Sequence, residues 1–131
     1  MIFVDTGAWF ASVVTSDTDY QIASTWLNQN TKPLITTDYV VDETLTLLRM
    51  RRETQRAIVL GDGFFSGALA TIHYLTEAEI QQSWQVFCRF SDKNWSFTDC
   101  TSKVVMESLS ITKAFAFDHH FDQFGSVQLV P

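Results

Sequence analysis

The sequence has few cysteines, prolines and glycines, and each shortage excludes a class of protein. The two cysteines, Cys88 and Cys100, lack the spacing of a metal cluster and cannot form a disulfide framework. We expect both to be free thiols in a reducing cytoplasm. Two prolines and five glycines among 131 residues exclude collagen-like and low-complexity chains. No apolar run approaches the ~20 residues of a membrane span, so we expect a cytoplasmic protein without membrane association.

Basic residues are also few. Lysine and arginine together number 9 against 15 acidic residues, which gives a formal net charge of -6. Domains that wrap duplex nucleic acid are usually basic, so this composition argues against that mode of binding. It is compatible with an enzyme that cuts one phosphodiester with metal ions, because such a site is itself acidic. The 11 phenylalanines and 4 tryptophans exclude a disordered chain, and the length predicts a single domain over residues 1–131.

Short apolar segments alternate with helical patterns along the chain. The expected strands cover 1–4, 34–36, 71–75, 114–117 and 127–130, and helices are expected over 9–14, 20–30, 38–50 and 54–65. Two further helices begin with the capping-box spacing, Thr76 with Glu79 and Ser96 with Asp99. This alternation predicts an α/β fold with a parallel sheet covered by helices on both faces. Functional sites of such folds lie beyond the carboxyl ends of the strands.

Two acids stand where expected strands end. Asp5 follows the apolar run Ile2-Phe3-Val4, and Asp118 follows Ala-Phe-Ala-Phe. A carboxylate in such apolar surroundings costs free energy unless a partner compensates for the lost water. The structural alternatives are that Asp5 caps the next helix and that Asp118 caps a turn.

The helix over 38–50 carries two adjacent acids with different surroundings. At about 100° per residue, Asp42 lies on the narrow polar face with Arg49. Glu43 lies beside Val40 and Leu47, on an apolar stripe. We therefore expect Asp42 to be solvated and Glu43 to point toward a site, with an ordinary surface glutamate as the alternative.

Asp99 opens a helix, where the helix dipole stabilises a carboxylate by ~0.3–1 kcal/mol, so a purely structural role is a strong alternative. If Asp5, Glu43, Asp99 and Asp118 converge, the energetics change. Two like charges 4 Å apart repel by ~1 kcal/mol in water and by ~4 kcal/mol at an effective dielectric constant of 20. At least one of the four then has a raised pKa in the absence of metal. Carboxylate oxygens are ligands that suit Mg²⁺ or Mn²⁺.

Four stretches that carry these acids resemble the PIN domain family of metal-dependent nucleases, and within it the VapC-like toxin ribonucleases of type II toxin–antitoxin pairs. The stretches are 2–6, 37–43, 97–99 and 115–121. The order of strands and helices matches nearly end to end. Gly7 departs from the serine or asparagine frequent in the family, and Ala116 and Phe117 stand where threonine or serine often precedes the fourth acid. The hydrogen bonds that orient ligands and water are then either missing or supplied by other hydroxyls, such as those of Thr6 or Thr98.

The resemblance implies a three-layer α/β/α PIN-like fold with a central parallel sheet. By resemblance, Asp5, Glu43, Asp99 and Asp118 form a catalytic metal site for Mg²⁺ or Mn²⁺. The implied activity is an endoribonuclease that hydrolyses RNA phosphodiester bonds and leaves a 5′-phosphate and a 3′-hydroxyl. The implied partners are the RNA substrate, a small antitoxin and a second copy of the chain. We expect some of the apolar residues of the helical segments from 9 to 50 to form a groove for an antitoxin helix or extended tail, or a dimer face. The candidates are Trp9, Phe10, Trp26, Val40 and Leu47.

Other interpretations fit fewer residues. Asp5-Thr6-Gly7 matches the retroviral-type aspartic proteases, but those enzymes are all-β. Asp118-His119-His120 resembles the DHH phosphoesterases, which are larger and carry further motifs absent here. His119 and His120 could contact phosphate or metal, and phosphate contact or a plain surface position is favoured. The alternative that stays open is a catalytically inactive PIN-like module that binds RNA or protein; the presence of all four acids favours the enzyme.

Overall fold

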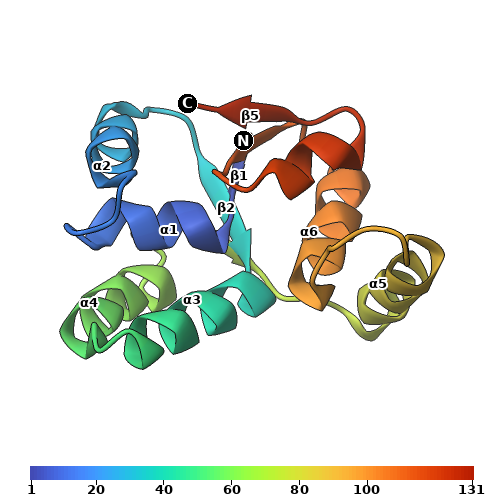
Figure 1. Cartoon of the computed structure of the whole chain (residues 1–131), viewed down its shortest axis with the longest axis horizontal. Helices are drawn as coiled ribbons and strands as arrows, with labels where there is room; N and C mark the ends of the chain where they lie inside the picture. The colour runs from blue at the N-terminus through green and yellow to red at the C-terminus, as the bar shows by residue number, and fades with distance from the viewer.

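The computed structural model describes the whole chain, residues 1–131 (Figure 1). The strands are β1 (Ile2–Val4), β2 (Leu34–Thr37), β3 (Thr71–His73), β4 (Lys113–Phe115) and β5 (Gln128–Val130). The α-helices are α1 (Thr6–Val13), α2 (Tyr20–Gln29), α3 (Asp38–Met50), α4 (Thr54–Phe65), α5 (Glu77–Arg89) and α6 (Phe97–Ser108). A 3₁₀ helix, η1 (His119–Phe124), precedes β5.

The five strands form one parallel sheet in the order β3-β2-β1-β4-β5. The central strand β1 pairs with β2 and β4, so that Phe3 lies opposite both Ile35 and Ala114. Every residue of β1 and β2 is buried, as a strand covered on both faces requires. The predicted α/β fold with a central parallel sheet is confirmed.

Helices cover the sheet on both sides. In Figure 1, α1 and α2 lie to the left of β1 and β2, α3 and α4 lie below them, and α5 and α6 lie to the right. From the first group, the Trp26 ring of α2 packs on Phe115 of β4, with ring centroids 4.2 Å apart. From η1, Phe121 packs on Phe3 of β1, with centroids 6.1 Å apart. Phe3, Phe115 and Phe121 belong to one core of 26 buried apolar residues, and the partly buried Trp26 packs against it.

Most expected elements are found, and α3 and α4 begin and end where the sequence predicted. The first helix begins at Thr6 rather than at residue 9, because Asp5 occupies the N-cap position directly after β1. The strand β3 ends at His73 and not at residue 75, because the backbone N–H of Leu75 donates to Asp38 Oδ1 (3.0 Å) instead of to the sheet. The longest helices, α3 and α5, have 13 residues each, and no helix has the length and apolar character to cross a membrane.

An apolar groove of about 530 Å³ lies between α3 and α4. Its walls include Leu45 and Met50 from α3 and Ile58 and Phe65 from α4. Met50 is 75% exposed and Phe65 is 66% exposed. The expectation that Trp9 contributes to such a face is wrong, because its ring is fully buried in the core against Phe64 of α4.

Candidate metal centre

The sheet topology brings three of the expected site acids to one edge. Asp5 directly follows β1, Glu43 is on α3, which begins where β2 ends, and Asp118 follows β4 by three residues. Because β2, β1 and β4 are adjacent and parallel, their carboxyl ends lie together at this edge. The fourth acid, Asp99, is in the first turn of α6.

Asp5 is buried, with 5% of its surface exposed. Its backbone N–H donates to the carbonyl of Phe115 (3.1 Å), which ties its position to β4. Although Asp5 occupies the N-cap position of α1, its side chain accepts no capping hydrogen bond. The alternative that the Asp5 side chain caps α1 is therefore not supported.

The electrostatic surroundings of Asp5 are unfavourable to its charge. Burial, with the negative charges of Asp99, Glu43 and Asp118, raises the pKa of Asp5 from 3.8 to about 7, and the backbone N–H of Thr6 offsets only part of this. The raised pKa expected for at least one of the four acids is thus found on Asp5. Three acids from separate parts of the chain lie near enough to act on one buried carboxyl. A bound cation would relieve this repulsion.

Asp99 has a structural role as well as a place at this edge. Its Oδ2 accepts the backbone N–H of Ser96 (3.0 Å), and the Ser96 hydroxyl accepts the backbone N–H of Asp99 (3.0 Å). The capping box expected from the sequence is therefore formed. Because the box fixes the side chain, Asp99 is held in place with 7% of its surface exposed.

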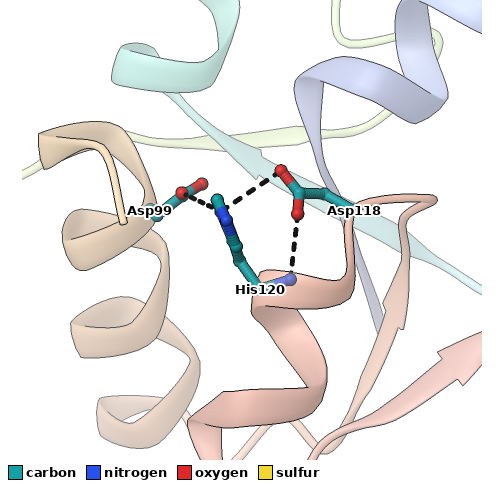
Figure 2. Close-up of side chains that lie close together, drawn as sticks. All are labelled: Asp99, Asp118 and His120. Atoms are coloured by element: carbon teal, nitrogen blue, oxygen red, sulfur yellow. Dashed lines mark hydrogen bonds and ion pairs between the residues drawn. The ribbon is translucent and has the colours of Figure 1, made fainter. Parts of the chain in front are cut away.

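Asp118 and Asp99 meet at a histidine (Figure 2). Nδ1 of His120 lies 2.9 Å from Asp99 Oδ2 and 3.3 Å from Asp118 Oδ2. The other carboxylate oxygen of Asp118, Oδ1, accepts the backbone N–H of His120 (2.9 Å) and caps η1, as the structural alternative for this acid expected. Asp99, Asp118 and His120 each offer one ligand atom, and all these atoms lie within 4.8 Å of one another. The three side chains could hold one metal ion.

The two acids of α3 differ as expected, with Glu43 half-buried and Asp42 exposed. The negative charge of Glu43 contributes to the raised pKa of Asp5, so Glu43 lies on the face of α3 that is turned toward Asp5. The donors that the structure groups together, two carboxylates with one imidazole, fit a divalent cation that binds oxygen and nitrogen, and the charges of Asp5 and Glu43 lie near them.

Sequence reasoning did not find the position of His120 between two acids. The available signal was a histidine two residues after a strand-end aspartate, which the first turn of η1 folds back toward the carboxylate. His119, next to it, is 89% exposed at its side chain and contacts only Asp122 (3.2 Å). Of the two hydroxyls named as candidates to support the acids, that of Thr6 is buried and forms no hydrogen bond, so it does not support them.

Comparison with known proteins gives consistent results. The family model "PIN domain" matches residues 2–127. The chain is 32% identical over 131 residues to the 23S rRNA-specific endonuclease VapC20 of Mycobacterium tuberculosis, covering 100% of this chain and 99% of that protein. It is 32% identical over 89 residues to a VapC ribonuclease of Archaeoglobus fulgidus, covering 67% of this chain and 55% of that protein.

Solved structures show the same fold. The crystal structure of Mycobacterium tuberculosis VapC20, described as a sarcin–ricin loop cleaving toxin, superposes over 100% of both chains with a TM-score of 0.92 and 28% identity. FitAcB from Neisseria gonorrhoeae superposes with a TM-score of 0.70 over 100% of this chain and 97% of that chain. At 14% identity, the second similarity concerns the fold alone.

Proposed function

The chain belongs to the PIN domain family, and from this premise we propose that it is a metal-dependent endoribonuclease, the toxin of a toxin–antitoxin pair. The observation that carries the proposal is the buried Asp5, surrounded by Asp99, Glu43 and Asp118. Such a cluster is costly for folding and useful for holding a cation. We propose that residues 1–131 act as one domain in the cytoplasm, where RNA is available.

We propose that Asp5, Glu43, Asp99 and Asp118 hold Mg²⁺ or Mn²⁺. When bound, such an ion polarises a phosphodiester and activates water. The chain contributes rigid positions: Asp5 is tied to β4 through Phe115, and Asp99 is fixed by its capping box. Burial and the charge of Asp99 raise the pKa of Cys100 to about 11, which makes its thiol a poor nucleophile. Hydrolysis by water without a covalent intermediate is the chemistry these groups support.

The substrate proposal follows from the relative that matches the whole chain. Because that protein is a 23S rRNA-specific endonuclease, the first RNA to test is 23S rRNA and a sarcin–ricin loop oligonucleotide. Purified protein is incubated with this RNA in Mn²⁺, in Mg²⁺ and in EDTA, and the ends are analysed. We expect metal-dependent cleavage that leaves a 5′-phosphate and a 3′-hydroxyl and disappears in Asp5→Asn. Cleavage that persists in EDTA, or a 2′,3′-cyclic phosphate end, would refute this mechanism.

A chain that binds this RNA but cleaves it under no condition would favour the alternative, an inactive PIN-like binding module. The absence of both binding and cleavage with 23S rRNA would instead count against the proposed substrate.

For the antitoxin we propose the apolar groove between α3 and α4. Its exposed Met50 and Phe65 would be covered by apolar side chains of a small partner helix. Phe65→Ser should weaken toxin–antitoxin affinity by tenfold or more while cleavage by the free toxin is unchanged. Val59→Ser, on the same helix, 73% exposed and outside the groove, is the matched control. The proposed homodimer is tested by sedimentation of the toxin alone at micromolar concentration.

A further inference from the structure

The imidazole of His120 occupies the position between two carboxylates that come from different parts of the chain (Figure 2). Asp99 belongs to α6 and Asp118 to the segment after β4. Nδ1 of His120 lies 2.9 Å from one and 3.3 Å from the other. A single nitrogen so close to two carboxylate oxygens is at the place where their negative charges are best compensated.

The ring is held at this place by the fold. The backbone N–H of His120 donates to Asp118 Oδ1, which fixes the residue in the first turn of η1. The next residue, Phe121, is fully buried and packs on Phe3 and on Phe124, with centroids 6.1 Å and 4.7 Å apart. Because its neighbour is anchored in the core, the backbone of His120 has little freedom to move away from the acids.

We propose that His120 is a direct ligand, through Nδ1, of the ion that Asp99 and Asp118 hold, and that it makes this site prefer Mn²⁺ over Mg²⁺. This inference rests on the proposed function and names the ion and the residue that selects it. In the metal-free protein, Nδ1 lies within hydrogen-bond distance of both carboxylates. With an ion bound, Nδ1 would donate its lone pair to the ion and Nε2 would carry the ring proton. A proton that Nδ1 held before would move to Nε2 or, from a doubly protonated ring, to solvent.

The selectivity follows from the chemistry of the donors. Mg²⁺ binds oxygen in near-ideal octahedral geometry and retains several waters, so an imidazole adds little to its affinity. Imidazole nitrogen is a good ligand for first-row transition ions, most of all for those later than manganese. Of the two ions proposed here, Mn²⁺ is the transition ion, so we expect the imidazole to add more to its affinity than to that of Mg²⁺. A site of carboxylates alone would discriminate less between the two ions.

The experiment is pulsed electron paramagnetic resonance of the Mn²⁺ complex, with tag-free protein and without RNA. A directly bound imidazole gives a ¹⁴N modulation in the Mn²⁺ spectrum. We expect this modulation in the wild type and in the control His119→Asn, whose side chain is 89% exposed, and its loss in His120→Asn. Titration calorimetry should show Mn²⁺ affinity reduced tenfold or more in His120→Asn, and Mg²⁺ affinity changed by less than threefold.

The outcomes separate this inference from the proposed function. Saturable Mn²⁺ binding without nitrogen modulation in the wild type overturns the role of His120 and leaves the ribonuclease proposal standing. This result needs no variant, so it decides the question even if His120→Asn does not fold. Modulation that persists in folded His120→Asn also overturns the inference, as does an equal loss of Mg²⁺ and Mn²⁺ affinity. No binding of either ion overturns both proposals.

Discussion

The helices α5 and α6 begin with the same device and use it differently. Each has a hydroxyl at the N-cap and an acid three residues later, Thr76 with Glu79 and Ser96 with Asp99. In each capping box the acid also contacts a histidine of another segment. Glu79 contacts His73 of β3 at 3.0 Å, and Asp99 contacts His120 of η1 at 2.9 Å.

The surroundings of the two acids differ in charge. Burial tends to raise the pKa of Glu79, but hydrogen bonds from the Thr76 backbone and from His73 outweigh it and the net shift is downward. The surroundings of Glu79 therefore favour its ionised form. The pKa of Asp5, in contrast, is raised to about 7 by burial and, after it, by the negative charges of Asp99 and the other acids. The same local motif forms a hydrogen-bonded pair of Glu79 with His73 in α5. In α6 it places Asp99 close to other negatively charged side chains.

A capping acid can therefore also be placed where an ion would bind. A capping box satisfies the helix terminus with one carboxylate oxygen and at the same time fixes the direction of the side chain. Whether the residue then serves function depends on what the rest of the chain places near it. Near Glu79 the chain places a single histidine, His73. Near Asp99 it places Asp118 and His120, and the charge of Asp99 acts on the buried Asp5.

The largest expected contrast is in catalysis. Asp99→Asn should lower the RNA cleavage rate by on the order of a thousandfold or more, because a charged oxygen is lost where the ion is held. Glu79→Gln keeps the shape of the corresponding acid in α5 and should change the rate by less than about threefold. Single-turnover cleavage at saturating Mn²⁺ measures both. Equal losses in the two variants would show that the capping boxes do not differ in function.

The next contrast concerns stability and pH in EDTA. Because the folded-state pKa of Asp5 is about 7 and the ordinary value is 3.8, the folded protein binds more protons between these values. Stability contributed by protonated Asp5 is present below about pH 4 and is lost as the pH rises through 7, by up to about 4 kcal/mol. Asp5→Asn should abolish this decline, whereas Glu79→Gln should retain it.

Chemical denaturation at several pH values measures the free energy of unfolding for this test. A wild-type free energy of unfolding that does not change from pH 4 to pH 8 would contradict the raised pKa of Asp5. Adding Mn²⁺ to the wild type at pH 8 should restore stability, because a bound ion compensates for the same repulsion.

Local patterns in the sequence predicted much of this molecule. The bounds of α3 and α4, both capping boxes, and the contrast between Asp42 and Glu43 follow from periodicity and turn residues. The strand-end acids could be found because a parallel sheet gathers its carboxyl ends. The catalytic roles of these acids stay predictions.

What the sequence did not predict depends on contacts between distant elements. The position of His120 requires that η1 fold back over α6, and no local pattern encodes that contact. The groove between α3 and α4 is formed by apolar residues that do not pack into the core, and the sequence does not show which residues these are. For this reason Trp9, which is fully buried, was wrongly counted among the candidates. The early end of β3 results from one hydrogen bond, from the backbone N–H of Leu75 to the Asp38 carboxylate, and these two residues are far apart in the chain.

The smallest contrast tests the capping hydroxyls themselves. Thr76→Ala and Ser96→Ala each remove one side-chain acceptor at a helix N-terminus, so each should lower the free energy of unfolding by ~1 kcal/mol. Only Ser96→Ala should also slow RNA cleavage, several-fold, because the first turn that orients Asp99 is loosened. Denaturation curves and cleavage rates for the two variants give four values to compare. If both variants lose the same stability and neither slows cleavage, the capping box of α6 is purely structural, and the position of Asp99 is set by His120 instead.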